Sequence, residues 1–230
     1  NADYLVLTHS ALLNDGSGNN YVADYAAYRE SPAGGGHQVS IADVNELYEQ
    51  FAYGVRFHPI AVRNFLHFAK KKWPALAHCF IIGKGLDYVN FRNPSTQAQQ
   101  EGTLFFVPTF STPAADIPFV LSGARLGTPV AAIGRLAVTK PSQIRDYLEK
   151  VKTHEQQVAL APQTIEGRAW MKRVIHNSGG QNTENVAIRN YTSEMANILI
   201  NNRFGAEVHP FYKTSDDPIQ LSSYEQMLDL

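Results

Sequence analysis

The chain has 230 residues, of which 44% are hydrophobic and 18% charged, and its 20 basic side chains nearly balance its 21 acidic ones. A net charge this close to zero argues against a general nucleic-acid binder or a protein drawn to acidic membranes. No apolar run approaches the roughly 20 residues that cross a bilayer, so we expect no membrane-spanning segment. The single cysteine, Cys79, excludes an internal disulfide, and a chain of this length folds without one.

The first half of the chain alternates strand and helix patterns. An almost continuous apolar run at 77–83 predicts a strand covered on both faces, with Cys79 as a buried core thiol. The predicted elements are, in order, a strand at 3–9, a loop at 14–20, a helix from 21 that stops at 31–36, a strand at 37–44, helices at 45–51 and 58–73, and a strand at 77–83.

The second half begins with a long irregular stretch from 84 to about 129, whose prolines include Pro108, Pro113, Pro118 and Pro129. After it the strand and helix patterns return, and the segment at 160–167 looks like a connector. The predicted elements are a buried strand at 129–136, a helix at 140–157, a strand at 172–176, a turn at 177–182, a helix at 183–205, a strand at 206–213, a turn at 214–218 and a helix at 222–230.

Strands that alternate with helices predict an α/β protein with a mostly parallel sheet and helices on both faces. We expect a three-layer unit at 3–158, a connector at 159–170, and an incomplete second α/β unit at 171–230. Two strands make a poor free-standing domain. The second unit is therefore expected to be unfinished.

Three segments resemble binding or catalytic loops. The sequence "GKGLD" at 83–87 follows a strand, where open α/β sheets bind ligands, but it matches neither the phosphate-loop nor the dinucleotide pattern. The glycines at 31–36 follow a helix, whereas phosphate binding requires glycines before one. The segment "HNSGGQ" at 176–181 has the order strand, turn, helix, although Ser178 is not in a Gly-x-Ser-x-Gly elbow. It is a plain turn, a pocket-lining turn, or a turn that carries His176 as a catalytic base.

No metal site and no cofactor are predicted. The eight histidines show no His-x-x-x-His or Glu-x-x-His spacing on a helix, and Cys79 has no neighbouring cysteine ligand. The adjacent carboxylates at 216–217 fit a turn better than a calcium site.

The joint order of several motifs resembles the gingipain-type cysteine peptidases, whose fold is caspase-like (flavodoxin-like, three-layer). The similarity covers most of residues 3–155 and continues through "KRVIHNSGG" and the helix that follows it. Its specific parts are "YGVRFHPIAVRNFLHFA" and "IGRLAV…YLEKV". Within the family the chain is most similar to the type IX secretion sortase (PorU-like) branch of Bacteroidetes.

The resemblance implies two caspase-like subdomains, of which only the second is catalytic. Lys84 then stands where the active copy has histidine, and Gly134 and Arg135 stand where it has cysteine, so the first unit would be a silent copy. "GKG" also replaces an acidic turn that many relatives have. The chain would stop short of the catalytic histidine and cysteine, with His176, Asn177 and Ser178 bordering the substrate pocket.

Two functions follow. In the first, the chain is the N-terminal part of a secreted or cell-surface cysteine endopeptidase or sortase that acts on polypeptides and is inactive alone. In the second, it is a non-enzymatic caspase-like module for binding or assembly at the bacterial cell surface. A flavodoxin-like small-molecule binder is favoured only if phosphate or nucleotide binds near Lys84 or Ser178. We also expect that the open edge of the second sheet can pair with another copy.

Overall fold

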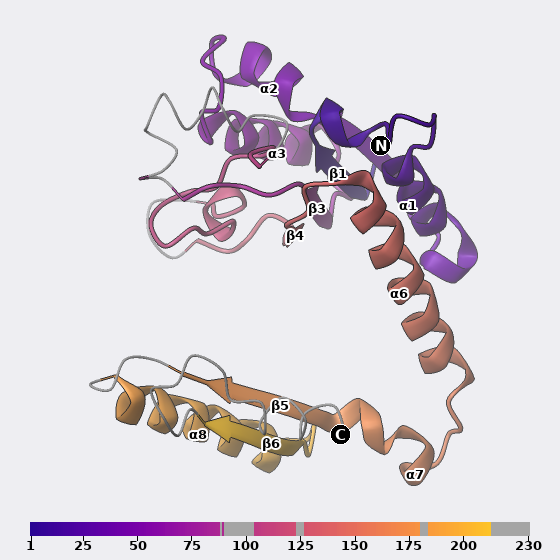
Figure 1. Cartoon of the computed structure of the whole chain (residues 1–230), viewed down its shortest axis with the longest axis vertical. Helices are drawn as coiled ribbons and strands as arrows, with labels where there is room; N and C mark the ends of the chain where they lie inside the picture. The colour runs from indigo at the N-terminus through magenta and orange to yellow at the C-terminus, as the bar shows by residue number, and fades with distance from the viewer. Residues whose placement is uncertain (88, 90–103, 123–126, 180–183, 213–230) are drawn as a thin grey trace. The chain divides into compact units, whose positions relative to one another are not determined.

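The computed structural model describes residues 1–87, 89, 104–122, 127–179 and 184–212 (Figure 1). It contains two compact units, unit 1 from Asn1 to Val158 and unit 2 from Ala159 to Leu230. Each unit is described by itself.

Unit 1 is built on a parallel sheet with the strand order β2-β1-β3-β4. Helices flank this sheet (Figure 1), which confirms the predicted α/β class. All five residues of β1 are buried, as expected for a central strand of a covered sheet. The strands are β1 (Tyr4–Thr8), β2 (Val39–Asp43), β3 (His78–Ile82) and β4 (Ala132–Leu136).

The helices of unit 1 are α1 (Tyr21–Glu30), α2 (Val44–Phe51), α3 (Ile60–Lys72) and α6 (Pro141–Leu160). On one face of the sheet, Phe80 of β3 stacks on Tyr25 of α1 and on Tyr147 of α6. Figure 1 shows α2 and α3 on the other side of the strands. Local sequence fixes the helix ends: the Asn20 side chain caps α1 by accepting the N–H of Ala23 at 3.0 Å.

The irregular stretch after β3 contributes to the core of unit 1. Phe105, Phe106 and Val107 are buried, as are Phe119 and Val120 around the short 3-10 helix Ile117–Phe119. The prediction of an irregular segment is confirmed in its described part, and the aromatic residues explain why it is held against the sheet.

A strand forms within the predicted range 129–136, but the prediction that it is buried is wrong. Ala132 and Gly134 of β4 are exposed, and the other three residues of the strand are half-buried. Within the described residues β4 pairs with β3 alone, so it is an edge strand. An apolar sequence run does not distinguish an edge strand from a central one.

Unit 2 contains a parallel pair of strands and one long helix. Among the described residues these strands form a two-stranded sheet, and α8 contacts both of them. A one-turn helix and a 3-10 helix precede β5. The elements are α7 (Ile165–Arg168), the 3-10 helix Ala169–Lys172, β5 (Arg173–Ser178), α8 (Asn185–Asn201) and β6 (Glu207–Tyr212).

Three boundaries in this region differ from the predictions. The helix predicted at 140–157 continues to Leu160, inside the predicted connector. The strand predicted to end at His176 continues through Asn177 and Ser178, because these residues pair in register with β6. The helix predicted to run to Gly205 ends at Asn201, and Gly205, with φ +60°, closes a turn by donating its N–H to the carbonyl of Asn202.

Several predicted features lie outside the described residues. They are residues 90–103 of the irregular stretch, residues 180–182 of the predicted turn, the start of the helix at 183, the turn at 214–218 and the helix at 222–230.

The apolar side chains of α8 are only partly covered. Ile188 and Leu199 are half-buried, whereas Tyr191, Met195 and Ile198 are 57–65% exposed. Within the described part of unit 2, the two strands are too narrow to cover the apolar side of the helix.

Candidate functional site

The carboxyl ends of β1, β3 and β4 meet at one edge of the sheet of unit 1. Open α/β sheets usually bind ligands at this edge. His9 follows β1, Gly83 and Lys84 follow β3, and Arg135 lies near the end of β4. The edge therefore contains Lys84 and Arg135, which the family resemblance was expected to place where an active copy has histidine and cysteine.

Arg135 is a buried cation whose hydrogen-bonding capacity is fully used. Its side chain is 10% exposed. Nε and Nη2 donate to the two carboxylate oxygens of Asp116, both at 2.8 Å. Nη1 donates to the carbonyls of Gly83 (2.7 Å) and Val107 (3.0 Å), and Nη2 also donates to the carbonyl of Pro108 (2.8 Å). A guanidinium has five N–H donors, and all five are engaged.

These bonds give Arg135 a structural role. The contact with Asp116 is bidentate, which is the strongest hydrogen-bonding arrangement between an arginine and a carboxylate. It ties β4 to the end of β3 and to the buried segment after Phe106. With its charge matched and its donors occupied, Arg135 has no donor left for a ligand.

The turn "GKG" is held by its backbone. The N–H of Lys84 donates to the carbonyl of Val138, and the carbonyl of Lys84 accepts the N–H of Phe106, both at 2.9 Å. Gly83 has φ +138°, and a Cβ there would lie 2.9 Å from the Cβ of Phe106. Only glycine fits at this position, because any other side chain would collide with Phe106. The side chain of Lys84 is exposed.

Cys79 is unsuited to act as a nucleophile. It is 3% exposed and lies in the interior of β3, three residues before the strand ends. Burial raises the pKa of its thiol to about 12. The thiolate is the nucleophilic form of cysteine, so at neutral pH this side chain behaves as the expected core thiol.

His9 is a polar side chain at this edge that the sequence did not single out. It is 7% exposed, its Nδ1 accepts the N–H of Ala11 at 3.0 Å, and its ring meets Phe106 edge-on. These contacts cap the short 3-10 helix Ser10–Leu12 and pack the ring into the core. Its position after an apolar strand was the only available signal.

In unit 2 the structure separates the three residues predicted to border a pocket. Alternation along β5 puts His176 and Ser178 on one face and Asn177 on the other. Tyr212, opposite Ser178, lies on the face of α8, because its hydroxyl is 3.3 Å from that of Ser193. His176 and Ser178 therefore face α8, while Asn177 is exposed on the opposite face.

His176 and Ser178 also carry polar atoms without a bond. The Nδ1 of His176 and the Oγ of Ser178 are buried and have no hydrogen-bond partner within the described part of the chain. Ser178 is 5% exposed. Buried polar groups normally find partners, so these two differ from the fully bonded groups around Arg135.

Two hollows in the surface of unit 1 lie away from the carboxyl edge. Two neighbouring hollows of about 400 and 420 Å³ share Gln38 and Trp73, and one of them includes Asp3, which precedes β1. They lie at the amino edge of the sheet, where the strands begin. No group of three or more metal-ligating side chains, and no helix able to cross a membrane, occurs in the described residues.

The sequence located Arg135 but missed its partner. Asp116 lies 19 residues earlier in the irregular stretch, where no periodicity predicts a contact. The signal was a charged residue inside the apolar run "VAAIGRL", because a buried charge requires an opposite charge beside it.

The parallel sheet with helices on both faces defines an α/β domain of the caspase-like peptidase class. The family model of Peptidase family C25 matches residues 1–227. The chain therefore belongs to peptidase family C25, the gingipain family of cysteine peptidases. No curated protein and no solved structure matches it.

Proposed function

We propose that unit 1 is the catalytically silent subdomain of a gingipain-like cysteine endopeptidase or type IX secretion sortase, and that residues 171–230 begin its catalytic subdomain. The observation that carries this proposal is the bonding of Arg135. Where an active copy requires a thiolate, unit 1 has a guanidinium whose five donors are all occupied.

The chemistry of a cysteine peptidase explains why this matters. A thiolate attacks the peptide carbonyl, and a neighbouring histidine transfers the protons. Cys79 is the one cysteine of these 230 residues, and its pKa of about 12 keeps it protonated. The proposal therefore holds that residues 1–230 lack the catalytic dyad and are inactive alone.

In the active enzyme, His176 and Ser178 would border the pocket for the polypeptide substrate. Their unbonded polar atoms support this assignment. Asn177 lies on the other face of β5 and would contact the substrate only from that side.

The proposal extends to the setting of the protein. The motifs "YGVRFHPIAVRNFLHFA" and "IGRLAV…YLEKV" favour the PorU-like branch of Bacteroidetes, and that branch implies export to the cell surface or the medium. Fractionation of the source cells tests this assignment. Recovery from the cytoplasm alone would contradict it.

We also propose that unit 2 associates through the open edge of its sheet. In the described residues neither outer edge of the β5-β6 pair has a strand partner, and an open edge is a template for pairing. Ile175, 46% exposed on the face opposite α8, adds apolar surface. Light scattering should show a mass that rises with concentration, whereas a monomer at high concentration would contradict the proposal.

The test of the enzymatic proposal is labelling by a thiol-reactive peptide probe. Residues 1–230 should not be labelled, and the full product of the gene should be labelled at a cysteine other than Cys79. A Cys79→Ser variant of both proteins is the matched control and should change neither result. If the full product also fails to react, the non-enzymatic module for binding or assembly is correct; if Cys79 reacts, the assignment of a silent unit is wrong.

A further inference from the structure

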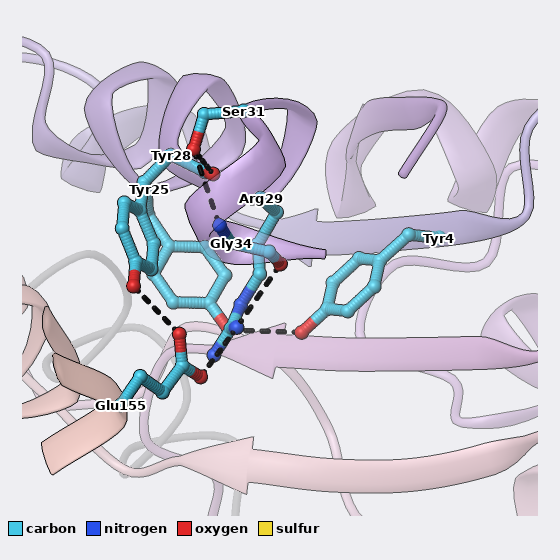
Figure 2. Close-up of polar contacts among 7 residues, drawn as sticks. All are labelled: Tyr4, Tyr25, Tyr28, Arg29, Ser31, Gly34 and Glu155. Carbon is cyan, nitrogen blue, oxygen red and sulfur yellow. Dashed lines mark hydrogen bonds and ion pairs between the residues drawn. The ribbon is translucent and has the colours of Figure 1, made fainter. Parts of the chain in front are cut away.

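A cluster of polar side chains joins the end of α1 to α6 (Figure 2). Tyr28 and Arg29 lie in the last turn of α1, and Glu155 lies in the second half of α6. Nη1 of Arg29 donates to one carboxylate oxygen of Glu155 at 2.7 Å, and the hydroxyl of Tyr28 donates to the other at 2.6 Å. Both oxygens of Glu155 are thus held by α1.

Arg29 is itself anchored in the core of unit 1. Its Nε donates to the hydroxyl of Tyr25 at 3.0 Å, and that hydroxyl lies 2.9 Å from the hydroxyl of Tyr4 in β1. Tyr25 is 1% exposed, and its ring stacks on Phe80 of β3. The contact with Glu155 is therefore connected to the centre of the sheet.

The turn after α1 fixes this end of the helix. Ser31 donates to the carbonyl of Tyr28 at 2.6 Å and accepts the N–H of Gly34 at 3.2 Å (Figure 2). A Cβ at Gly34 would overlap the carbonyl of Tyr28, so only glycine permits this packing. The carbonyl of Gly34 also accepts from Arg29. The sequence showed this segment only as a helix stop.

On the other side, α6 is attached to unit 1 unevenly. Its buried residues, Ile144 and Leu148, lie in its first half. Glu155 is half-buried, whereas residues 156–160 are all exposed, and unit 2 begins at Ala159. Glu155 therefore joins α6 to α1 close to the point where unit 1 ends.

The cluster keeps Glu155 charged. Burial by itself would raise its pKa, but hydrogen bonds from Tyr28 and Arg29 hold the pKa below its usual value. The neighbouring His154 also lowers this pKa, and the Nζ of Lys152 lies 5.9 Å from the centre of the Tyr28 ring. An ionised carboxylate that receives two hydrogen bonds makes a stronger contact than a neutral pair.

We propose that Tyr28, Arg29 and Glu155 form a clamp that fixes the last turns of α6 and the point where the connector leaves unit 1. Its release frees the helix beyond Leu148 and the connector, while the sheet of unit 1 stays folded. The inference does not depend on the proposed function.

Hydrogen exchange measured by mass spectrometry on the whole chain tests this clamp. In Glu155→Ala, amides 150–160 should exchange about tenfold faster, because a charge-assisted contact is lost. Alanine favours helix, so faster exchange cannot come from helix propensity. Amides of β1 and β3 should keep their rates. Tyr28→Phe, which keeps the ring and loses one donor, should give a smaller increase in the same peptides.

The matched control is Glu149→Ala, on the same helix. Glu149 is 64% exposed and pairs with Lys152 at 2.9 Å, and its loss should change exchange by less than about twofold. Unchanged exchange at 150–160 in both Glu155→Ala and Tyr28→Phe would overturn the proposal. An equal increase in β1 would also overturn it, because the cluster would then belong to the global core.

Discussion

Units 1 and 2 both contain parallel strands packed against a helix, but they differ in how many of their apolar side chains are buried. All five residues of β1 are buried in unit 1, whereas no residue of α8 is buried in the described part of unit 2. A parallel sheet normally needs a cover on both faces. Unit 1 meets this requirement with its own residues, and the described residues of unit 2 do not.

The polar groups of the two units differ in the same way. At the carboxyl edge of unit 1, every donor of Arg135 has a partner. At the end of β5, the Oγ of Ser178 is buried and has no hydrogen-bond partner among the described residues. A buried hydroxyl without a bond costs about 1–3 kcal/mol. The polar groups at the carboxyl edge of unit 1 are thus satisfied by contacts within unit 1, whereas the described residues of unit 2 leave a polar group at the end of β5 without a hydrogen-bond partner.

The largest expected effect comes from removing the hydrogen bonds of Arg135 at the carboxyl edge of unit 1. Arg135→Met leaves Asp116 as an unpaired, part-buried carboxylate and removes the donors of three carbonyls, so we expect a loss of about 3–5 kcal/mol in the free energy of unfolding of unit 1. The measurement is denaturant unfolding followed by tryptophan fluorescence. A Trp170→Phe background leaves Trp73 to report on unit 1 alone.

Arg145→Met is the matched control for that substitution. Arg145 pairs with Asp146 at 2.8 Å, but both side chains are more than half exposed. Its loss should change the stability by no more than about 0.5 kcal/mol. If the two variants were equally stable, Arg135 would not hold the edge together.

A smaller effect distinguishes the cores of the two units. Leu66 is 1% exposed in α3, and Leu66→Ala should cost about 2–5 kcal/mol. Ile198 is 65% exposed in α8, and Ile198→Ala should cost no more than about 0.5 kcal/mol. Chemical denaturation of each variant provides the comparison. A large loss for Ile198→Ala would show that α8 is covered in solution.

The sequence predicted best what depends on local pattern. The apolar runs at β1 and β3, the turn-rich loop before α1 and the glycines after it all gave elements at the expected places. The family resemblance drew attention to Lys84 and Arg135 before their contacts were known, and their place opposite a catalytic pair stays a prediction.

Contacts between distant residues were not predictable in this way. Arg29 and Glu155 are 126 residues apart, and Arg135 meets Asp116 through a stretch without periodicity. The edge position of β4 and the continuation of β5 through Ser178 depend on strand pairing, which one strand's sequence does not contain. The exposure of apolar side chains on α8 was not predictable either, because it depends on what packs against the helix.

The measurement that tests the central claim most directly is the alkylation rate of Cys79 in the native chain, followed from pH 7 to 11. Because Cys79 is the one cysteine, the signal has no second source. The account predicts alkylation about a thousandfold slower than in the denatured chain at neutral pH, with a rate that still rises at pH 10. Alkylation at the rate of a free thiol, levelling off near pH 8, would contradict it and would give unit 1 a reactive cysteine.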